Sequence, residues 1–192
     1  MKKRIFAFAV AVICMSILAS TTLAYFTDTS IARNVITSGG VDIAVEEWQE
    51  TQDGLIPYPD KSIKVMPATQ VSKIITVRNL DARSFIRVKL ELTLLDGEEQ
   101  VMDIPAEEME KIIHLIMNTQ DWREKDGWWY YGAAVNTNEA TLPLMTAVEF
   151  DGPNMTNEYQ KTTLQIRVIA QAVQAANNAT TALEALGWPE AE

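Results

Sequence analysis

The side chains that could perform chemistry in this chain are few and far apart in the sequence. The chain has one histidine, His114, and one cysteine, Cys14. A zinc site of the usual kind needs three or four such ligands, and a nucleophilic cysteine needs a histidine as its base. His114 is flanked by Ile113 and Leu115, and no His-Glu-x-x-His motif occurs. We therefore expect no catalytic residue, no metal site and no cofactor, and we assign His114 to packing or to a helix surface.

Two acidic turns and one acidic helix face are the remaining candidates for ion binding. Residues 96–99 (DGEE) and 151–154 (DGPN) offer oxygen ligands, but neither fits a twelve-residue calcium loop. Asp-Gly chemistry explains both segments as turns. Glu107, Glu108 and Glu110 are typical of a solvated helix face. These patterns favour a protein that works by binding, not by catalysis.

Four adjacent aromatic residues form the most conspicuous candidate for a binding surface. Trp128, Trp129, Tyr130 and Tyr131 stand between two glycines. On a strand, successive side chains point to opposite faces, so two rings fall on each face. One pair then packs in the core. The other pair either completes the sheet packing or forms a partner or glycan surface.

Length and charge limit the classes of function. The chain has 192 residues, which suits one domain. Its formal net charge is -10, with 26 acidic and 16 basic residues. Nucleic-acid binding needs a clustered positive surface, so we expect no nucleic-acid partner. One cysteine excludes a disulfide scaffold.

The N-terminus has the pattern of a secretory signal peptide. Basic residues 2–4 precede an uncharged apolar run over residues 5–18. This run is shorter than the ~20 residues of a membrane-spanning helix. Small side chains at Thr22 and Ala24 predict cleavage between Ala24 and Tyr25. The alternative is an uncleaved anchor, in which case the protein meets the membrane only through this segment.

Cleavage would leave residues 25–192 as a single exported domain. The mature chain would contain no cysteine, since Cys14 lies in the leader. Its stability must then come from a packed core, which a chain of this length can supply. We expect the protein outside the cell, in the extracellular matrix or at the cell surface, with a signal peptidase as its partner during export.

Alternating apolar residues predict a series of short strands in the mature chain. The clearest lies in the segment 85–94, where one face is apolar and the other is polar. Its apolar face consists of Ile86, Val88, Leu90, Leu92 and Leu94. Further strands are predicted in residues 41–46, 71–78, 127–135, 144–150 and 163–172.

Helical spacing of apolar residues predicts one amphipathic helix, at about residues 105–118. A capping-box pattern from Thr181 to Glu184 also suggests a short terminal helix ending near Gly187. Strands dominate and do not alternate with helices. We therefore predict a mainly β fold, an antiparallel β-sandwich or jelly roll with one inserted helix and an N-terminal signal helix.

Several segments, in order along nearly the whole chain, resemble the TasA/camelysin family of exported Gram-positive bacterial proteins. The most informative is the junction Ala24-Tyr25-Phe26-Thr27-Asp28, because an aromatic pair followed by a Thr-Asp turn is unusual at a cleavage site. The other matching segments are Gly40-Val41-Asp42-Ile43, Val77-Arg78-Asn79 followed by Phe85-Ile86-Arg87-Val88, and Ile169-Ala170-Gln171-Ala172-Val173-Gln174-Ala175.

The resemblance implies a jelly-roll sandwich and processing by a SipW-type signal peptidase. It also implies assembly into biofilm matrix fibres, in which the N-terminal segment of one subunit adds as a strand to its neighbour. Residues 25–38 are suited to this role because they are short and carry spaced apolar side chains. These side chains are Tyr25, Phe26, Ile31, Val35 and Ile36. The same residues could equally pair within their own sheet, and the sequence does not distinguish the two arrangements.

Three hypotheses of function follow. The first is a secreted structural protein, a biofilm or matrix fibre subunit that associates with itself or with sister subunits by strand addition. The second is a secreted metallopeptidase of camelysin type, which would depend on His114. The third is a cell-surface binding module that uses the aromatic residues 128–131.

Overall fold

The computed structural model describes residues 34–37, 41–59, 62–159 and 161–189. Among these residues, no helix has the length and apolar character needed to cross a membrane. The predicted signal segment, the cleavage junction and the first part of the predicted assembly strand lie outside the described residues. The structure therefore does not test the predictions made for Thr22, Ala24, Tyr25, Phe26 and Ile31, and they stay predictions.

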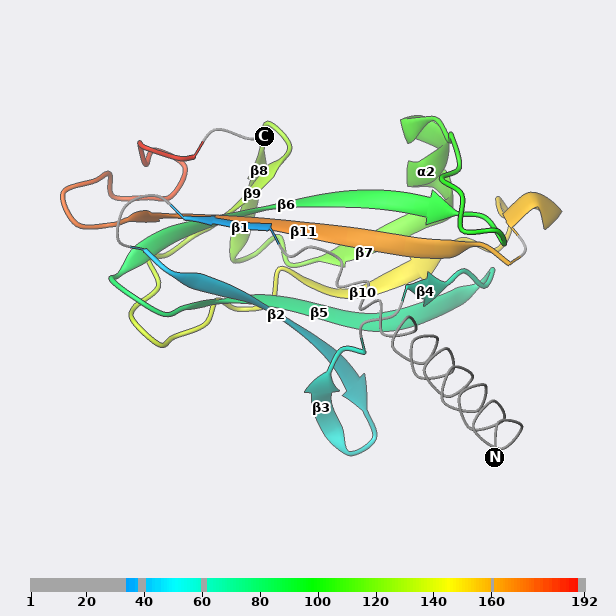
Figure 1. The fold of residues 1–192 in the computed structure, drawn as a ribbon, viewed down its shortest axis with the longest axis horizontal. Helices are drawn as coiled ribbons and strands as arrows, with labels where there is room; N and C mark the ends of the chain where they lie inside the picture. Colours follow the sequence, from blue (N-terminus) through cyan, green and yellow to red (C-terminus); the bar gives the residue numbers. More distant parts are fainter. Residues whose placement is uncertain (1–33, 38–40, 60–61, 160, 190–192) are drawn as a thin grey trace, which may run out of the picture. The chain divides into compact units, whose positions relative to one another are not determined.

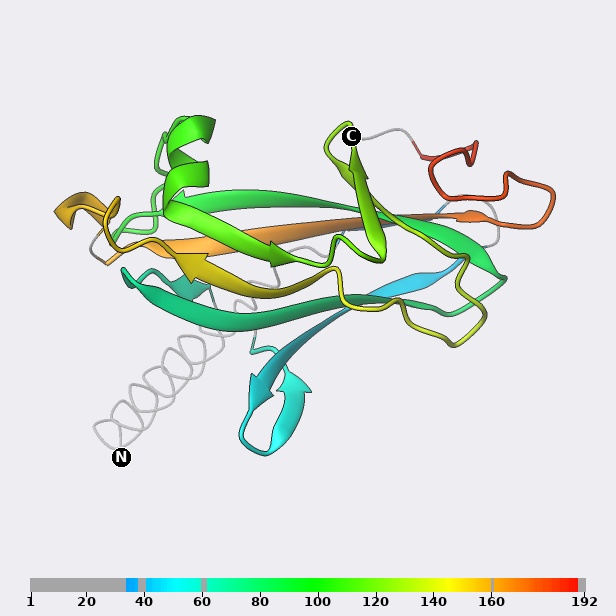
Figure 2. The ribbon, with the colours of Figure 1, turned by 180° about the vertical axis from the view of Figure 1, so that it is seen from behind.

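The described residues form an antiparallel β-sandwich, which confirms the predicted fold class. Figures 1 and 2 show two sheets stacked as layers. The first sheet has the order β1-β11-β6-β9-β8, and β4 also pairs with β11. Its strands are β1 (Asn34–Thr37), β4 (Ile63–Lys64), β6 (Ser84–Leu95), β8 (Trp122–Lys125), β9 (Trp128–Tyr131) and β11 (Thr163–Gln174).

The second sheet has the order β3-β2-β5-β10-β7. Its strands are β2 (Ile43–Thr51), β3 (Gly54–Pro57), β5 (Thr69–Asn79), β7 (Ile113–Met117) and β10 (Met145–Phe150). One α-helix, α2 (Ala106–Ile112), precedes β7, and a 3-10 turn, η1 (Asn157–Tyr159), precedes β11.

The pairing of β6 with β11 is the longest in the fold and follows from the alternation of both sequences. All twelve residues of β6 pair with β11, from Ser84 opposite Gln174 to Leu95 opposite Thr163. The alternate residues that face the second sheet are apolar, so the pair contributes one wall of the core. Its apolar members with no exposed surface are Ile86, Val88, Leu94, Leu164, Ala170 and Ala172.

The inserted helix is present but shorter than the sequence predicts. α2 ends at Ile112, and residues 113–117 form strand β7, which pairs with β10. The apolar residues of this segment fit a helical spacing, but Ile113, Leu115 and Met117 also alternate as a strand requires. Pairing with β10 decides between the two patterns, because tertiary contacts override a weak local preference.

The predicted terminal helix is also corrected. Residues 182–184 form a turn, not a helix, although the expected partners do meet. The Oγ1 atom of Thr181 lies 3.2 Å from Oε2 of Glu184, and the Glu184 N–H donates to the Thr181 carbonyl. These contacts are not the reciprocal side-chain-to-backbone hydrogen bonds of a capping box. No helix follows, because Ala185 and Trp188 pack on the first sheet instead.

Trp122 is the largest fully buried side chain and gives the first testable prediction. Its Nε1–H donates to the Leu142 carbonyl at 3.1 Å. We expect Trp122→Ala to lower the free energy of unfolding by about 3–5 kcal/mol, because the cavity cannot refill. The exposed neighbour Lys125 serves as the control, since Lys125→Ala should change the free energy of unfolding by less than about 0.5 kcal/mol. Urea unfolding measures both, and equal effects would contradict this account of the core.

Candidate functional site

Open strand edges are the main candidate functional feature of this fold. The second sheet ends in β3 on one side and in β7 on the other. In the first sheet, β9 pairs with β6 only at Arg87 and Val88. Among the described residues, no strand pairs with the stretch 89–93 of β6 on that side. Unpaired N–H and C=O groups at such edges are the usual acceptors for an added strand.

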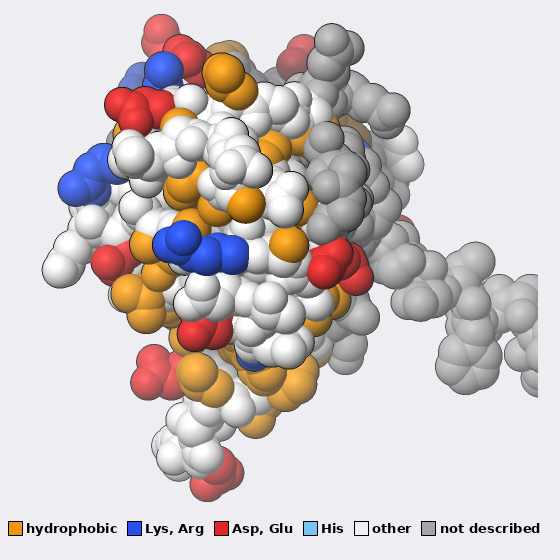
Figure 3. Space-filling model, turned by 90° about the vertical axis from the view of Figure 1, so that its left-hand side faces the viewer, with side chains coloured by type: hydrophobic (Ala, Val, Ile, Leu, Met, Phe, Trp, Pro, Cys, Tyr) orange, Lys and Arg blue, Asp and Glu red, His pale blue; other side chains and the backbone are white. Residues whose placement is uncertain are grey.

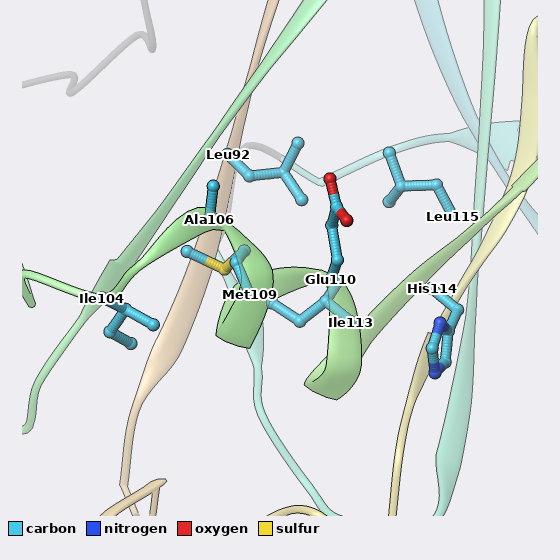
Figure 4. A pocket seen from close by; sticks show the side chains of 8 residues that line it. All are labelled: Leu92, Ile104, Ala106, Met109, Glu110, Ile113, His114 and Leu115. Atoms are coloured by element: carbon cyan, nitrogen blue, oxygen red, sulfur yellow. The ribbon is translucent and has the colours of Figure 1, made fainter.

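An apolar groove lies between two of these open edges. Its volume is about 600 Å³, and it is bounded by β6, the segment before α2, α2 itself and β7. Its apolar lining consists of Leu92, Ile104, Ala106, Met109, Ile113 and Leu115. Figure 4 shows the Glu110 side chain extending between Leu92 and Leu115, with its carboxylate at the groove. The groove therefore offers apolar surface together with two polar lining residues, Glu110 and His114.

A buried tyrosine holds α2 against the sandwich. Tyr159, from η1, is 2% exposed, and its hydroxyl donates to Oε1 of Glu108 at 2.5 Å. Burial and then this hydrogen bond raise the pKa of Tyr159 to about 12. The Asp151 N–H also donates to the carbonyl of Ile112, the last residue of α2. The groove wall formed by the helix is thus fixed at both of its ends.

His114 lies on the outer face of β7. Its Nε2 atom is 4.0 Å from Oδ2 of Asp151, and its side chain is 46% exposed. Figure 4 shows the ring pointing away from Leu92 and Leu115. Within the described residues, no group of three or more histidine, cysteine, aspartate or glutamate side chains could hold a metal ion. His114 is on an edge strand, not on the helix to which the sequence assigned it.

The two acidic turns use their carboxylates locally. The Oδ1 atom of Asp96 accepts hydrogen bonds from the N–H groups of Glu98 and Gln100. The Oδ1 atom of Asp151 accepts one from the Asn154 N–H. Both arrangements are the turn chemistry that the sequence predicts.

The four aromatic residues are divided between the two faces of β9, as the sequence predicts. Trp129 and Tyr131 are half-buried and pack against the main core, where the Tyr131 ring lies 5.1 Å from that of Trp122. Trp128 and Tyr130 are buried on the opposite, outer face. A second apolar cluster covers them, and it includes Ala182, Ala185 and Trp188 from the C-terminal segment. A partner could contact Trp128 and Tyr130 only after this segment moved, and their role as a partner surface stays a prediction.

Arg87 organises this second cluster. Its guanidinium lies over the Trp128 ring at 4.2 Å and the Trp188 ring at 4.7 Å from the centroids. Its Nε and Nη2 atoms donate to Oε1 of Gln171 at 2.9 and 2.6 Å, and Nη2 also donates to the Pro189 carbonyl at 3.2 Å. Arg87 therefore binds the end of the chain to the outer face of the first sheet.

The alternation in residues 85–94 predicts that Phe85 and Arg87 lie on the polar, solvated face of this strand, and the structure corrects this prediction. Phe85 is 3% exposed, and residues 175–189 lie over this end of β6. Gln171 is fully buried beside Arg87, and its Nε2 atom has no hydrogen-bond partner among the described residues. The signal that could have revealed the cluster is Trp188, a large aromatic residue beyond the last predicted strand that needs a surface to cover it.

Part of the predicted assembly strand is described. Val35 and Ile36 lie in β1, which pairs in parallel with β11 of the same chain. Asn34 is opposite Ile169, and Thr37 is opposite Ala172. The sequence leaves open whether this segment pairs within its own sheet or with a neighbouring subunit. In the single chain, these four residues pair within their own sheet. Strand addition to a neighbour stays a prediction.

A buried ion pair fixes the base of the β2–β3 hairpin. Lys73 is 5% exposed, and its Nζ lies 3.2 Å from Oε2 of Glu47 and 3.8 Å from the centroid of the Tyr58 ring. Burial and the Glu47 carboxylate raise the pKa of Tyr58. The Tyr58 N–H also donates to the Glu47 carbonyl at 2.8 Å. The hairpin is thus held firmly where it leaves the sandwich, a constraint that sequence reasoning missed.

Comparisons of the chain with protein-family models, curated proteins and solved structures give no significant match.

The Arg87 cluster predicts that lysine cannot replace arginine. Arg87→Lys keeps the charge but loses the planar contact with two indole rings and the paired hydrogen bonds to Gln171. We expect residues 175–189 to detach, with faster amide hydrogen exchange there and a loss of about 1–3 kcal/mol in the free energy of unfolding. Arg167→Lys is the matched control, because Arg167 is exposed and its one ion pair among the described residues is with Glu91. Unchanged exchange in Arg87→Lys would refute the role given to Arg87.

Tyr159 predicts a pH-dependent stability at alkaline pH. Its folded pKa of about 12 exceeds the ordinary tyrosine value of ~10, so the native state holds this proton more tightly than the unfolded chain. The stabilisation is fully present below pH ~10 and is lost as pH rises through about 12. Tyr159→Phe should be less stable than wild type by about 1–3 kcal/mol at pH 8. Denaturant unfolding should show this difference shrinking between pH 10 and 12, whereas a constant difference would contradict the assignment.

Proposed function

We propose that this protein is a secreted structural subunit that assembles with copies of itself, or with sister matrix subunits, by strand addition. In this proposal residues 1–24 are removed during export, and the mature chain works at the cell surface or in the extracellular matrix. The resemblance to the TasA/camelysin family supports a biofilm matrix fibre as the assembled form. The proposal assigns the protein no catalytic reaction.

The observation that carries the proposal is the outer edge of β11. Two short strands of the same chain cover its ends, β4 at Thr163 and Leu164 and β1 at Ile169–Ala172. Among the described residues, no strand pairs with the stretch 165–168 on this side. A four-residue partner supplies few main-chain hydrogen bonds, so a longer segment from a neighbour could replace it at little cost.

The side chains of β11 favour such an exchange. Leu164, Ile166 and Val168 are buried and alternate along the strand. A strand added beside them would extend the same sheet and bring its own alternate apolar side chains over the same core. Residues 25–38 contain apolar side chains for this purpose, beginning with Tyr25 and Phe26, which cleavage would place at the new N-terminus.

No observation on the described residues favours the peptidase hypothesis over assembly. Among the described residues, the one ion pair of His114 is with Asp151, at 4.0 Å. Casein cleavage that required a metal and was abolished by His114→Ala would overturn the proposal.

The proposal predicts that assembly depends on the N-terminal segment. We expect electron microscopy to show fibres of the protein that begins at Tyr25, and none of a form that lacks residues 25–38. The physical reason is that the truncated form has an acceptor edge on β11 but no segment to donate. If both forms stay monomeric under all conditions, or both polymerise equally, the proposal fails.

A peptide experiment tests the acceptor directly. A labelled peptide of residues 25–38 should bind the truncated protein in fluorescence anisotropy. The matched control is the same peptide with Ile31→Asp and Val35→Asp, which keeps the length but removes two apolar side chains. Equal binding of the two peptides would contradict apolar strand addition.

A further inference from the structure

The second sheet is open at both ends, and the two ends differ in character. Its order begins at β3 and finishes at β7, and each has one partner strand among the described residues. β3 belongs to a hairpin that projects from the sandwich, whereas β7 borders the apolar groove (Figures 1 and 2). One sheet thus carries a projecting element at one end and a hollow at the other.

The projecting hairpin exposes apolar side chains that its own chain does not cover. Leu55 is 57% exposed and Ile56 is 44% exposed, and both lie on the edge strand β3. Figure 3 shows the hairpin as a separate projection, with apolar side chains on its flank and an acidic side chain at its tip. Because the Lys73–Glu47 pair fixes its base, the hairpin presents these residues on a rigid support.

The backbone of Leu55 faces the open side of β3. Leu55 is opposite Glu50 of β2, and the Glu50 N–H points the other way, donating to Oγ of Ser72 on β5 at 3.0 Å. In an antiparallel pair, the N–H and C=O groups of two opposite residues either bond to each other or both point away from the partner strand. The N–H and C=O of Leu55 are therefore directed outward. Pro57 has no N–H to donate, so pairing on this edge must centre on Leu55.

The backbone of Leu115 faces the open side of β7 by the same argument. The Ile112 carbonyl accepts from the Asp151 N–H, and the Asn118 N–H donates to the Leu144 carbonyl, so the even-numbered residues face β10. Leu115 alternates with them and is directed outward. Its side chain lines the groove, whereas the next side chain, Ile116, is 39% exposed on the outer face.

We propose that β3 of one copy adds to β7 of a second copy, with Leu55 opposite Leu115. Opposite residues in a sheet share a face, so Leu55 enters the groove beside Leu92 and Met109. Ile56 then lies on the outer face, where Ile116 is exposed. The occupant of the groove is thus the hairpin of another copy of this chain.

This contact is heterologous and can therefore repeat from copy to copy. The projecting surface and the receiving surface are different parts of the same chain, so each copy can give and receive at once. The second sheets of successive copies become one continuous sheet in the direction β3 to β7. The contact uses neither residues 25–38 nor the β11 edge, so its failure and the failure of the proposed function are distinguishable.

Site-specific disulfide formation tests the contact in the whole processed chain, which contains no cysteine once residues 1–24 are removed. One copy carries Leu55→Cys, and a second copy with a longer tag carries Leu115→Cys. Mild oxidation of the mixture should give a crosslinked heterodimer on non-reducing electrophoresis. The control mixture pairs Val101→Cys with Leu115→Cys, because Val101 is an apolar residue outside β3 that is 70% exposed. We expect at least tenfold more crosslinked heterodimer from the Leu55→Cys mixture than from this control. Equal yields from the two mixtures would overturn the proposal.

A second variant separates the groove from the strand edge. Ala106 is exposed and lines the groove, so Ala106→Trp fills it without disturbing a buried position. Added to the Leu115→Cys copy, it should reduce the heterodimer at least tenfold. An undiminished yield would overturn insertion of Leu55 into the groove. Circular dichroism of each variant confirms that the loss of crosslinking is not a loss of fold.

Discussion

The pairing of β6 with β11 is the constraint on which the rest of this structure depends. Two twelve-residue strands in one register fix which side chains face the second sheet and which face outward. The inward set builds the core with the second sheet. The outward set brings Arg87 opposite Gln171 and so creates the surface on which the end of the chain packs. A shift of one residue would exchange these two faces and lose both.

The edge strands around this central pair differ in length and in the polarity of their side chains. β8 ends the first sheet with four residues, and three of them are exposed. By contrast, β7 and the second half of β6 are longer and border apolar side chains. Natural proteins usually shorten, charge or cover their edge strands to prevent association. Edges left apolar and open are consistent with a protein whose proposed role is to associate.

The sequence predicts the fold class and most strands because alternation is a strong local signal. It predicts two rings of residues 128–131 on each face for the same reason. It does not predict where α2 ends, since Ile113 to Met117 satisfy two periodicities and only the position of β10 decides between them. It also does not reveal the Arg87 cluster or the Lys73–Glu47 pair. Their partners lie far apart in the chain, and no local pattern links them.

The position of β11 in the chain has a consequence for how the protein reaches its fold. The strand that lies between β6 and β1 is the last of the described strands along the chain, and the residues that cover Phe85 and Trp128 follow it. Contacts of such long sequence separation make folding slow, because the entropy of closing a long loop is lost before they form. Until then the half-finished sandwich carries exposed aromatic surface, which is prone to aggregate. A chaperone that keeps the nascent polypeptide unfolded would therefore protect it during biogenesis.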